Sequence, residues 1–153
     1  MYGTIESIRM HITFTKPRLS DAPIMAKWGK ENESMRDCED DTWYSSELLR
    51  KWIADPKEDT ILVARDGETL IGMCLVHGMR GWAYFSSLYV AEAYRNNGVG
   101  TALLTRMMKI LKKKKYVDCA LLVKETNTEA ADFYRKQGFK KGFLFRWMGK
   151  KLS

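Results

Sequence analysis

The segment from Tyr94 to Thr101 has the composition of an anion-binding turn. It reads Tyr-Arg-Asn-Asn-Gly-Val-Gly-Thr, between a predicted strand that ends at Val90 and a predicted helix that begins near Gly98. A helix N-terminus offers unpaired backbone N–H groups and the positive end of the helix dipole. Gly98 and Gly100 let the backbone approach phosphate oxygens, and Arg95 adds a permanent charge. The turn therefore predicts a phosphate-bearing ligand, with a plain structural turn as the alternative.

Two familiar phosphate-binding loops do not fit this turn. A Walker A loop requires lysine directly after its last glycine, whereas Gly100 is followed by Thr101 and Ala102. The dinucleotide fingerprint requires a third glycine at the position that Leu103 occupies. The ligand is therefore neither a P-loop nucleotide nor a dinucleotide in the Rossmann manner.

A second group of residues with chemical potential lies on the last predicted helix, residues 126–137, which ends at Gly138. Asn127, Ala130 and Tyr134 are spaced by three and four residues, so they share one helix face. A partly buried amide and phenol both need polar partners. That face either meets a ligand or packs in the core with its polar ends at the surface.

Together and in this order, the turn and the helix face resemble two motifs of the GNAT superfamily of acyl-CoA-dependent N-acyltransferases. Arg95, Gly98 and Gly100 match its diphosphate motif, and the stretch from Asn127 to Phe139 matches its C-terminal motif. The specific match begins at Trp82 and covers about half of the chain; before it, only the order of elements agrees. Further matching residues are Leu88, Tyr89 and Val90 in the preceding strand and Trp147, Met148, Lys150 and Leu152 in a closing strand.

The resemblance implies acetyl-CoA as co-substrate and no metal. In this family the fourth and fifth strands splay apart at a bulge, and the pantetheine arm lies in the gap. By position, the backbone from Leu88 to Val90 pairs with that arm, Asn127 hydrogen-bonds it, and Phe133 packs beside it. The residues implied for the diphosphate are Arg95, Asn96, Asn97, Gly98, Val99, Gly100 and Thr101.

The implied reaction is direct attack of a neutral primary amine on the thioester carbonyl. A backbone N–H near Val90 can support the oxyanion that forms. Tyr134 is the implied catalytic residue, because a phenol with a pKa of about 10 can give a proton to a thiolate whose acid has a pKa of about 8.5.

The general base stays open. Some family members carry a glutamate on the fourth strand, where this chain offers Tyr84 and Ser86 instead. Because an aliphatic amine has a pKa near 10, some group must still take its proton. The candidates are His77, Glu92, Glu125 and an acidic residue between Asp37 and Asp41.

In this family the acceptor site is built largely from the first two helices and their connection. That region holds four large aromatic residues and an acidic run, which suits a cationic amine acceptor such as a protein amine or a polyamine. The alternative is that the aromatic residues are core and the acids a solvated loop. The residues are Trp28, Trp43, Tyr44 and Trp52 with Glu39, Asp40 and Asp41.

Composition predicts one globular domain, residues 1–153, with 45% hydrophobic residues and a formal net charge of +7. The N-terminus lacks a signal peptide and the apolar runs are too short to span a bilayer, so we expect a cytoplasmic protein. Cys38, Cys74 and Cys119 are too scattered for a disulfide framework or a four-ligand metal site, although Cys74 and His77 are spaced like metal ligands.

The predicted fold is a three-layer mixed α/β structure, with helices on both faces of a sheet that contains one splayed parallel strand pair. Strand, helix and strand around the glycine turn imply that pair. The run from Val117 to Val123 is typical of a strand buried on both faces. Predicted strands are 8–15, 60–65, 69–77, 82–90, 117–123 and one or two within 139–152; predicted helices are 21–30, 46–54, 98–113 and 126–137.

Two other classes of protein compete with the enzyme. A non-catalytic acyl-CoA-binding module would keep the glycine turn, although an intact Tyr134 argues against it. A nucleic-acid-binding protein would use the net charge and the run from Lys112 to Lys115, but no aromatic residues are interleaved there and no specific nucleic-acid motif is found. The resemblance also leaves a homodimer through the C-terminal strands open.

Overall fold

The computed structural model describes residues 10–38 and 42–152. Within these ranges five strands form one mixed sheet in the order β1-β2-β3-β4-β5. The first four pair antiparallel and β4 pairs with β5 in parallel. The strands are β1 (Ile12–Thr15), β2 (Thr60–Asp66), β3 (Thr69–Met79), β4 (Trp82–Val90) and β5 (Asp118–Leu121).

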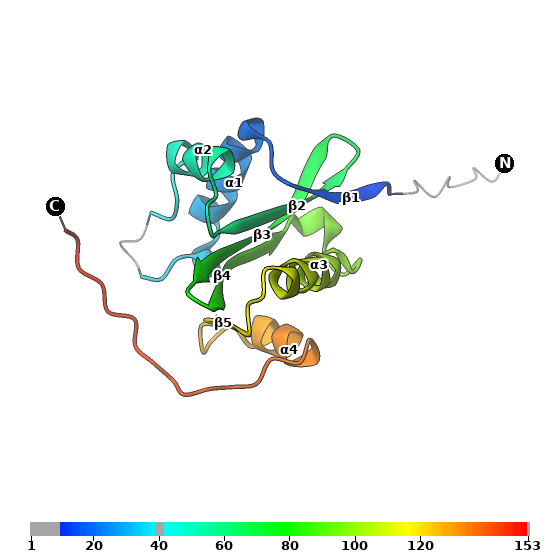
Figure 1. Cartoon of the computed structure of the whole chain (residues 1–153). Coiled ribbons are helices and arrows are strands. Elements are labelled where there is room, and N and C mark those ends of the chain that lie inside the picture. Colours follow the sequence, from blue (N-terminus) through cyan, green and yellow to red (C-terminus); the bar gives the residue numbers. More distant parts are fainter. Residues whose placement is uncertain (1–9, 39–41, 153) are drawn as a thin grey trace.

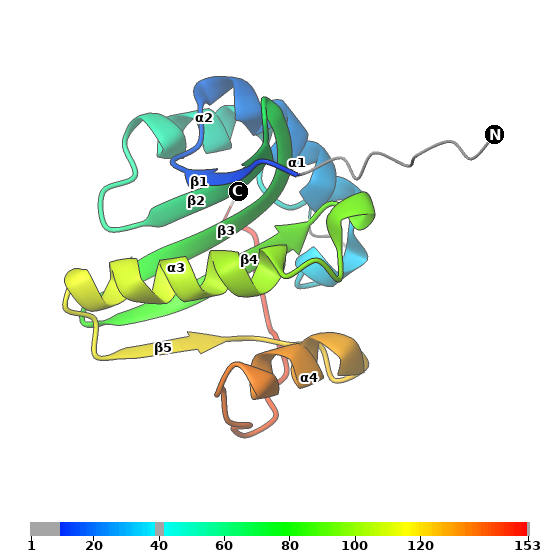
Figure 2. The ribbon, with the colours of Figure 1, turned by 90° about the vertical axis from the view of Figure 1, so that its right-hand side faces the viewer.

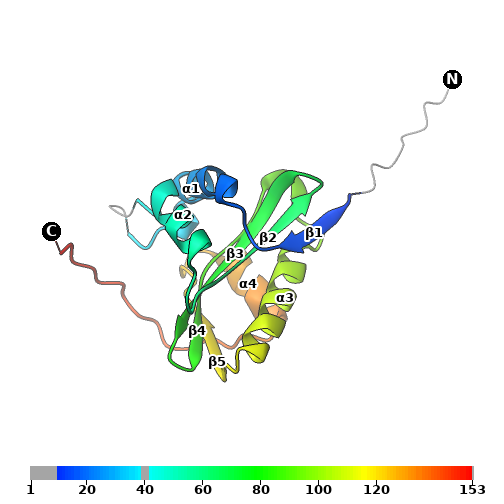
Figure 3. The ribbon, with the colours of Figure 1, turned by 45° about the horizontal axis from the view of Figure 1, so that its top comes forward.

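Helices cover both faces of this sheet. As Figure 3 shows, α1 (Ala22–Glu31) and α2 (Ser46–Ala54) lie on one face, and α3 (Val99–Lys113) and α4 (Thr128–Lys136) lie on the other. Three short 3-10 turns are η1 (Leu19–Asp21), η2 (Glu33–Met35) and η3 (Glu92–Tyr94). The predicted three-layer mixed α/β fold is confirmed.

Local sequence signals account for most of these boundaries. Gly67 has a φ of +58° in the β2–β3 turn, where it follows Asp66, and an Asp-Gly pair is typical of a tight hairpin. Ser45 begins α2 by accepting a hydrogen bond from the Leu48 N–H at 3.1 Å. Gly138, with a φ of +92°, follows the end of α4.

Two hydrophobic clusters occupy the two sides of the sheet. One lies beneath α3 and includes Phe85, Leu103 and Met107. The other lies beneath α1 and α2 and includes Met25 and Leu49. Each helix buries one stripe against the sheet, and we call these groups the α3 cluster and the α1–α2 cluster.

Two predictions for the C-terminal half are wrong. The strand expected over 117–123 is shortened to β5, which alternates between exposed and half-buried residues; Val117 is 87% exposed and Leu122 57% exposed. The stretch 139–152 contains no strand in the described chain, and it runs away from the sheet (Figure 1). A strand needs a hydrogen-bonded neighbour, so without this stretch beside it β5 becomes an edge strand.

The sequence-predicted start of the first strand at Ile8 lies outside the described residues. In the described part of the chain no helix combines the length and the apolar content that a bilayer crossing requires.

A buried ion pair fastens α1 to the sheet. Asp21 and Arg65 are 3% and 4% exposed, and the Arg65 guanidinium donates to the Asp21 carboxylate. The same carboxylate accepts a hydrogen bond from the Arg18 N–H at 2.6 Å. Asp21 directly precedes α1, yet its side chain pairs with Arg65 and does not cap the helix.

Removing one partner of this pair leaves a buried charge without compensation. We expect Asp21→Ala to lower the free energy of unfolding by about 3 kcal/mol, measured by urea denaturation. Glu68→Ala breaks the exposed pair with Arg18 and is the matched control; its midpoint should stay at the wild-type value. Equal losses in the two variants would contradict a special role for the buried pair.

Candidate active site

An extra residue in β4 opens the sheet. Along the β3–β4 ladder Leu75 pairs with Ser87 and Val76 with Phe85, so Ser86 has no partner and forms a bulge. The parallel pairing of β4 with β5 ends at Phe85 and Leu121, beside this bulge, although β4 continues to Val90. The predicted splayed pair is confirmed.

A narrow cavity of about 90 Å³ lies where β4 and β5 separate. One face of α4 and its cap contribute Asn127, Ala130 and Tyr134, the three residues that the sequence placed on one face. The segment around η2 closes another side, where the Lys124 ammonium donates to the Glu33 carbonyl at 2.7 Å. The strand residues at the cavity are Phe85, Ser86, Ser87 and Leu88 of β4 and Leu121, Leu122 and Val123 at and beyond the end of β5.

Tyr134 brings a phenol to the cavity from the α3 side of the sheet. Its ring packs against Phe133 and Phe139, with centroids 5.2 and 5.6 Å away. Burial, with a small contribution from the nearby Cys74, raises the pKa of Tyr134 far above its ordinary value. The hydroxyl therefore keeps its proton at any physiological pH.

Asn127 occupies the cap position of α4. Its side-chain oxygen accepts a hydrogen bond from the Ala130 N–H at 3.1 Å. The predicted helix began at Thr126, but this cap delays the first helical residue to Thr128. Because the oxygen faces the helix, the side-chain NH₂ group is what Asn127 can offer to a ligand.

The glycine turn lies at the N-terminus of α3. Gly98 has a φ of +78°, and the first intrahelical bond runs from the Ala102 N–H to the Gly98 carbonyl at 3.0 Å. The amides of Val99, Gly100 and Thr101 therefore lack acceptors within the helix. This end of α3 has the backbone geometry of an anion site.

Arg95 ties this turn to the end of β4. Its Nε donates to the Val90 carbonyl at 3.0 Å, and its guanidinium lies 5.6 Å from the Tyr89 ring centroid. Asn96 has a φ of +61°, and the Asn97 side chain donates to the Arg95 carbonyl at 2.9 Å. The turn is thus held by its own side chains.

Phe133 connects the turn with the cavity. A Cβ atom built on Gly100 would lie 3.8 Å from the Phe133 ring, so α4 packs directly over the first turn of α3. Gln137 at the other end of α4 donates to the Thr101 hydroxyl at 3.5 Å. Turn and cavity are therefore one continuous surface on the α3 side of the sheet.

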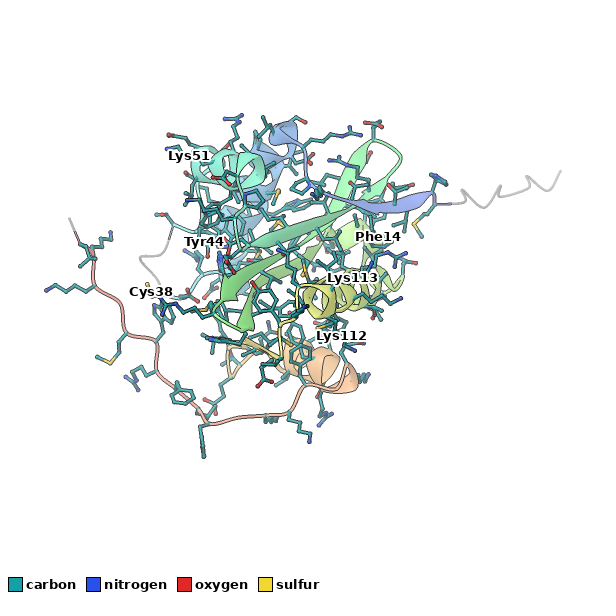
Figure 4. All side chains as sticks on the ribbon, in the orientation of Figure 1. Phe14, Cys38, Tyr44, Lys51, Lys112 and Lys113 are labelled. Carbon is teal, nitrogen blue, oxygen red and sulfur yellow. The ribbon has the colours of Figure 1, made fainter. Side chains whose placement is uncertain are left out.

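A polar chain that sequence reasoning missed reaches the cavity from the opposite side. The Tyr44 hydroxyl lies 3.1 Å from Ser86 Oγ and 3.3 Å from His77 Nε2. His77 Nδ1 lies 3.1 Å from Asp59 Oδ2. Figure 4 labels Tyr44 between α2 and the sheet. His77 was one of four candidate bases, but Tyr44 and Asp59 are 33 and 18 residues from it, and no local pattern joins them.

Ser87 is a second residue that the sequence did not single out. It is 6% exposed, lines the cavity, and its hydroxyl has no hydrogen-bond partner among the described residues. Directly paired residues of an antiparallel ladder share a face, so Ser87 faces the α1–α2 cluster with Leu75. Ser86 points to the same face, toward Tyr44. Two consecutive residues can share a face here because the bulge interrupts the usual alternation of the strand.

The predicted acceptor aromatics divide into two groups. Trp43 is 8% exposed and contacts the Gly29 backbone, so it is core, as the alternative interpretation held. Trp28, Tyr44 and Trp52 are half-buried at the edge of the α1–α2 cluster. Glu39, Asp40 and Asp41 lie outside the described residues.

The other candidate groups have ordinary surroundings. Cys74 is fully buried in the core, and burial raises the pKa of its thiol far above the usual range. In ranges 10–38 and 42–152 the cysteines are free thiols, and no cluster of three metal-ligating side chains occurs. The basic run ends α3, where Figure 4 labels Lys112 and Lys113, and Lys114 hydrogen-bonds the Thr60 hydroxyl at 2.7 Å.

Comparison with known proteins agrees with this geometry. The model of the Acetyltransferase (GNAT) family matches residues 25–139. The chain belongs to the GNAT family. A spermidine N(1)-acetyltransferase of Thermoplasma acidophilum is 31% identical to this GNAT protein in an alignment of length 113 that covers 63% of this chain and 70% of the relative.

Solved structures share the fold. The PaiA N-acetyltransferase of Thermoplasma acidophilum, in complex with coenzyme A, is 26% identical with a TM-score of 0.68, covering 86% of this chain and 91% of its own. An aminoglycoside acetyltransferase from an uncultured soil sample, in complex with sisomicin, is 16% identical with a TM-score of 0.73, covering 92% and 97%. This GNAT protein is thus an acyltransferase whose co-substrate is acetyl-CoA.

The residues present fit that co-substrate. The free amides at the start of α3 suit a diphosphate, and the narrow opening beside β4 suits a thin, extended arm. One continuous surface joins the two, through the packing of Phe133 over Gly100.

Arg95 provides a test of the turn. We expect Arg95→Ala to weaken binding of coenzyme A about tenfold, because it removes a charge beside the diphosphate and releases the Val90 carbonyl. Isothermal titration calorimetry gives the affinity. Arg50→Ala on α2 removes the same charge from the other face of the sheet and should bind like the wild type. A Kd that Arg95→Ala leaves unchanged would exclude Arg95 from binding the diphosphate.

Proposed function

We propose that this GNAT protein transfers the acetyl group of acetyl-CoA to a cationic primary amine, with Tyr134 as general acid. The observation that carries the proposal is a protonated, half-buried phenol at the opening between β4 and β5. Membership of the family indicates acetyl-CoA as the acyl donor, and the phenol at this opening supports the proposed proton transfer.

The donor side of the proposal follows the α3 side of the sheet. The pantetheine arm extends β5 along the exposed backbone of Leu88, Tyr89 and Val90, beyond the last β4–β5 pair. Asn127 turns its NH₂ group toward the arm, and Phe133 packs beside it. The diphosphate meets Arg95 and the amides of Asn96, Asn97, Gly98, Val99, Gly100 and Thr101.

The chemical step needs one proton at the leaving sulfur. The neutral amine attacks the thioester carbonyl, the C–S bond breaks, and the thiolate takes the proton of Tyr134. The attacking nitrogen, now an amide, gives up its surplus proton, which restores the Tyr134 phenol through solvent. A thiol has a pKa of about 8.5, so a phenol delivers a proton only where it is held beside the sulfur. Packing against Phe133 and Phe139 holds the Tyr134 ring in one orientation at the cavity, which supports this role.

The acceptor side follows the α1–α2 side of the sheet. Two relatives named above act on spermidine or aminoglycosides, which carry several amines. This side favours a cation for two reasons. It presents the half-buried aromatic rings of Trp28 and Trp52, and it carries the carboxylates of Asp37 and Asp59. A polyamine-like or protein amine fits these groups.

Tyr134→Phe removes the phenolic proton and keeps the ring. We expect kcat to fall about 100-fold while the Kd for acetyl-CoA stays near the wild-type value, measured by steady-state thiol release and calorimetry. Tyr116→Phe, which loses a hydrogen bond to Glu58 outside the cavity, is the control. Because burial raises the pKa of Tyr134, wild-type activity should show no loss from ionisation of this group up to about pH 10. Unchanged kcat in Tyr134→Phe would exclude the acid role.

The class of acceptor is tested by acetyl-CoA-dependent thiol release against a panel of amines. We expect turnover with spermidine, aminoglycosides or lysine-containing peptides, in preference to uncharged amines of similar size. Mass spectrometry should locate the acetyl group on a primary amine. Tight coenzyme A binding without turnover on any member would point to a non-catalytic acyl-CoA-binding module.

A further inference from the structure

We propose that Ser86, Tyr44 and His77 form a relay that removes the proton from the acceptor amine, with Asp59 orienting the histidine. The relay starts at the cavity, where Ser86 lies, and ends at His77 on β3. Its three heavy-atom separations are 3.1, 3.3 and 3.1 Å. The inference rests on the proposed function, since it assigns the missing base of that reaction.

Asp59 sets the direction of the relay. One carboxylate oxygen accepts the Gly78 N–H at 3.1 Å, which fixes the carboxylate, and the other faces His77 Nδ1. A proton on Nδ1 leaves the lone pair of Nε2 free to accept from the Tyr44 hydroxyl. The phenol oxygen of Tyr44 then accepts from Ser86, so the Ser86 oxygen points an open lone pair at the cavity.

The transfer balances in three movements. The ammonium of the acceptor gives a proton to Ser86 Oγ, while the Ser86 proton moves to Tyr44 and the Tyr44 proton to His77 Nε2. The amine becomes neutral, both hydroxyls are restored, and His77 becomes an imidazolium beside Asp59. The His77 side chain is 22% exposed, so the proton leaves to solvent from there.

The groups around His77 favour this role. Its titratable neighbours are Asp59 ahead of β2, Tyr44 ahead of α2 and Tyr84 of β4, while Trp52 of α2 contributes an uncharged edge 5.4 Å away. Burial, and after it the charges of Asp37 and Tyr44, raise the pKa of Tyr84. Tyr84 therefore stays neutral and does not compete for the proton, while Asp59 stabilises the imidazolium.

Two of the other candidate bases lie away from the cavity. Glu92 and Glu125 are exposed, and neither lines the cavity. Asp37 is exposed as well, and residues 39–41 lie outside the described chain. Among the bases that the sequence offered, His77 is joined to the cavity by hydrogen bonds.

The test is the pH dependence of kcat/KM in His77→Gln, with the most active aliphatic amine as acceptor. Near neutral pH we expect a fall of about 100-fold. Toward pH 10 such an amine loses its proton without help, so the gap between variant and wild type should close. A hydrazine acceptor, neutral at neutral pH, should be acetylated by the variant nearly as fast as by the wild type. A purely structural defect would lower the rate equally at every pH and for both acceptors.

Two smaller changes interrupt the relay without touching the histidine. Ser86→Ala and Tyr44→Phe should show the same loss near neutral pH and the same recovery at high pH. His11→Gln alters the other histidine, at the exposed start of the described chain, and is the matched control. Circular dichroism and coenzyme A affinity confirm that each variant is folded.

The outcomes separate the two proposals. A wild-type protein that acetylates no amine overturns the proposed function. A wild-type protein that is active, with pH profiles that His77→Gln and Ser86→Ala leave unchanged, overturns the relay alone. Recovery at high pH in His77→Gln but not in Ser86→Ala would also overturn it, because both lie on one proton path.

Discussion

β4 lies between β3, with which it pairs up to Val90, and β5, with which it pairs only up to Phe85. Opposite β3 it carries one residue too many, and Ser86 takes up the excess as a bulge. A bulge bends its strand, and beyond it β4 no longer follows β5. The cavity, the free backbone of β4 and the position of Ser86 all result from this extra residue.

The same interruption lets the two sides of the sheet meet. Tyr134 belongs to the α3 cluster, whereas Tyr44 and His77 belong to the face that α1 and α2 cover. An intact sheet would keep these groups on opposite sides, because successive side chains of a strand point to opposite faces. Because β4 and β5 separate, the Tyr134 phenol from one face and the Ser86 hydroxyl from the other line the same small cavity. Figure 2 shows β5 at this edge of the sheet, with α4 beside it.

Local patterns in the sequence were sufficient for the helices and for the antiparallel strands. The Asp66-Gly67 turn, the Ser45 cap and the apolar stripe of α3 each act over a few residues, so each could be read directly. The glycine turn was located for the same reason.

What depended on distant contacts was missed or wrong. Whether the stretch 139–152 forms a strand depends on pairing with a sheet edge, and its own residues carry no information about that pairing. The grouping of Asp59, His77 and Tyr44 arises from three separate elements. Trp43 looked like a binding residue, but the close approach of Gly29 buries it, and that contact has no local signature.

The division of the core into an α3 cluster and an α1–α2 cluster has a consequence for divergence. Substitutions in sites that share no partners contribute to stability additively. Residues of α1 and α2 can therefore change shape and charge while the packing of Phe133 over Gly100 stays intact. Under the proposed function, a lineage built on this scaffold can exchange the molecule it modifies without repacking the half that binds the acyl donor.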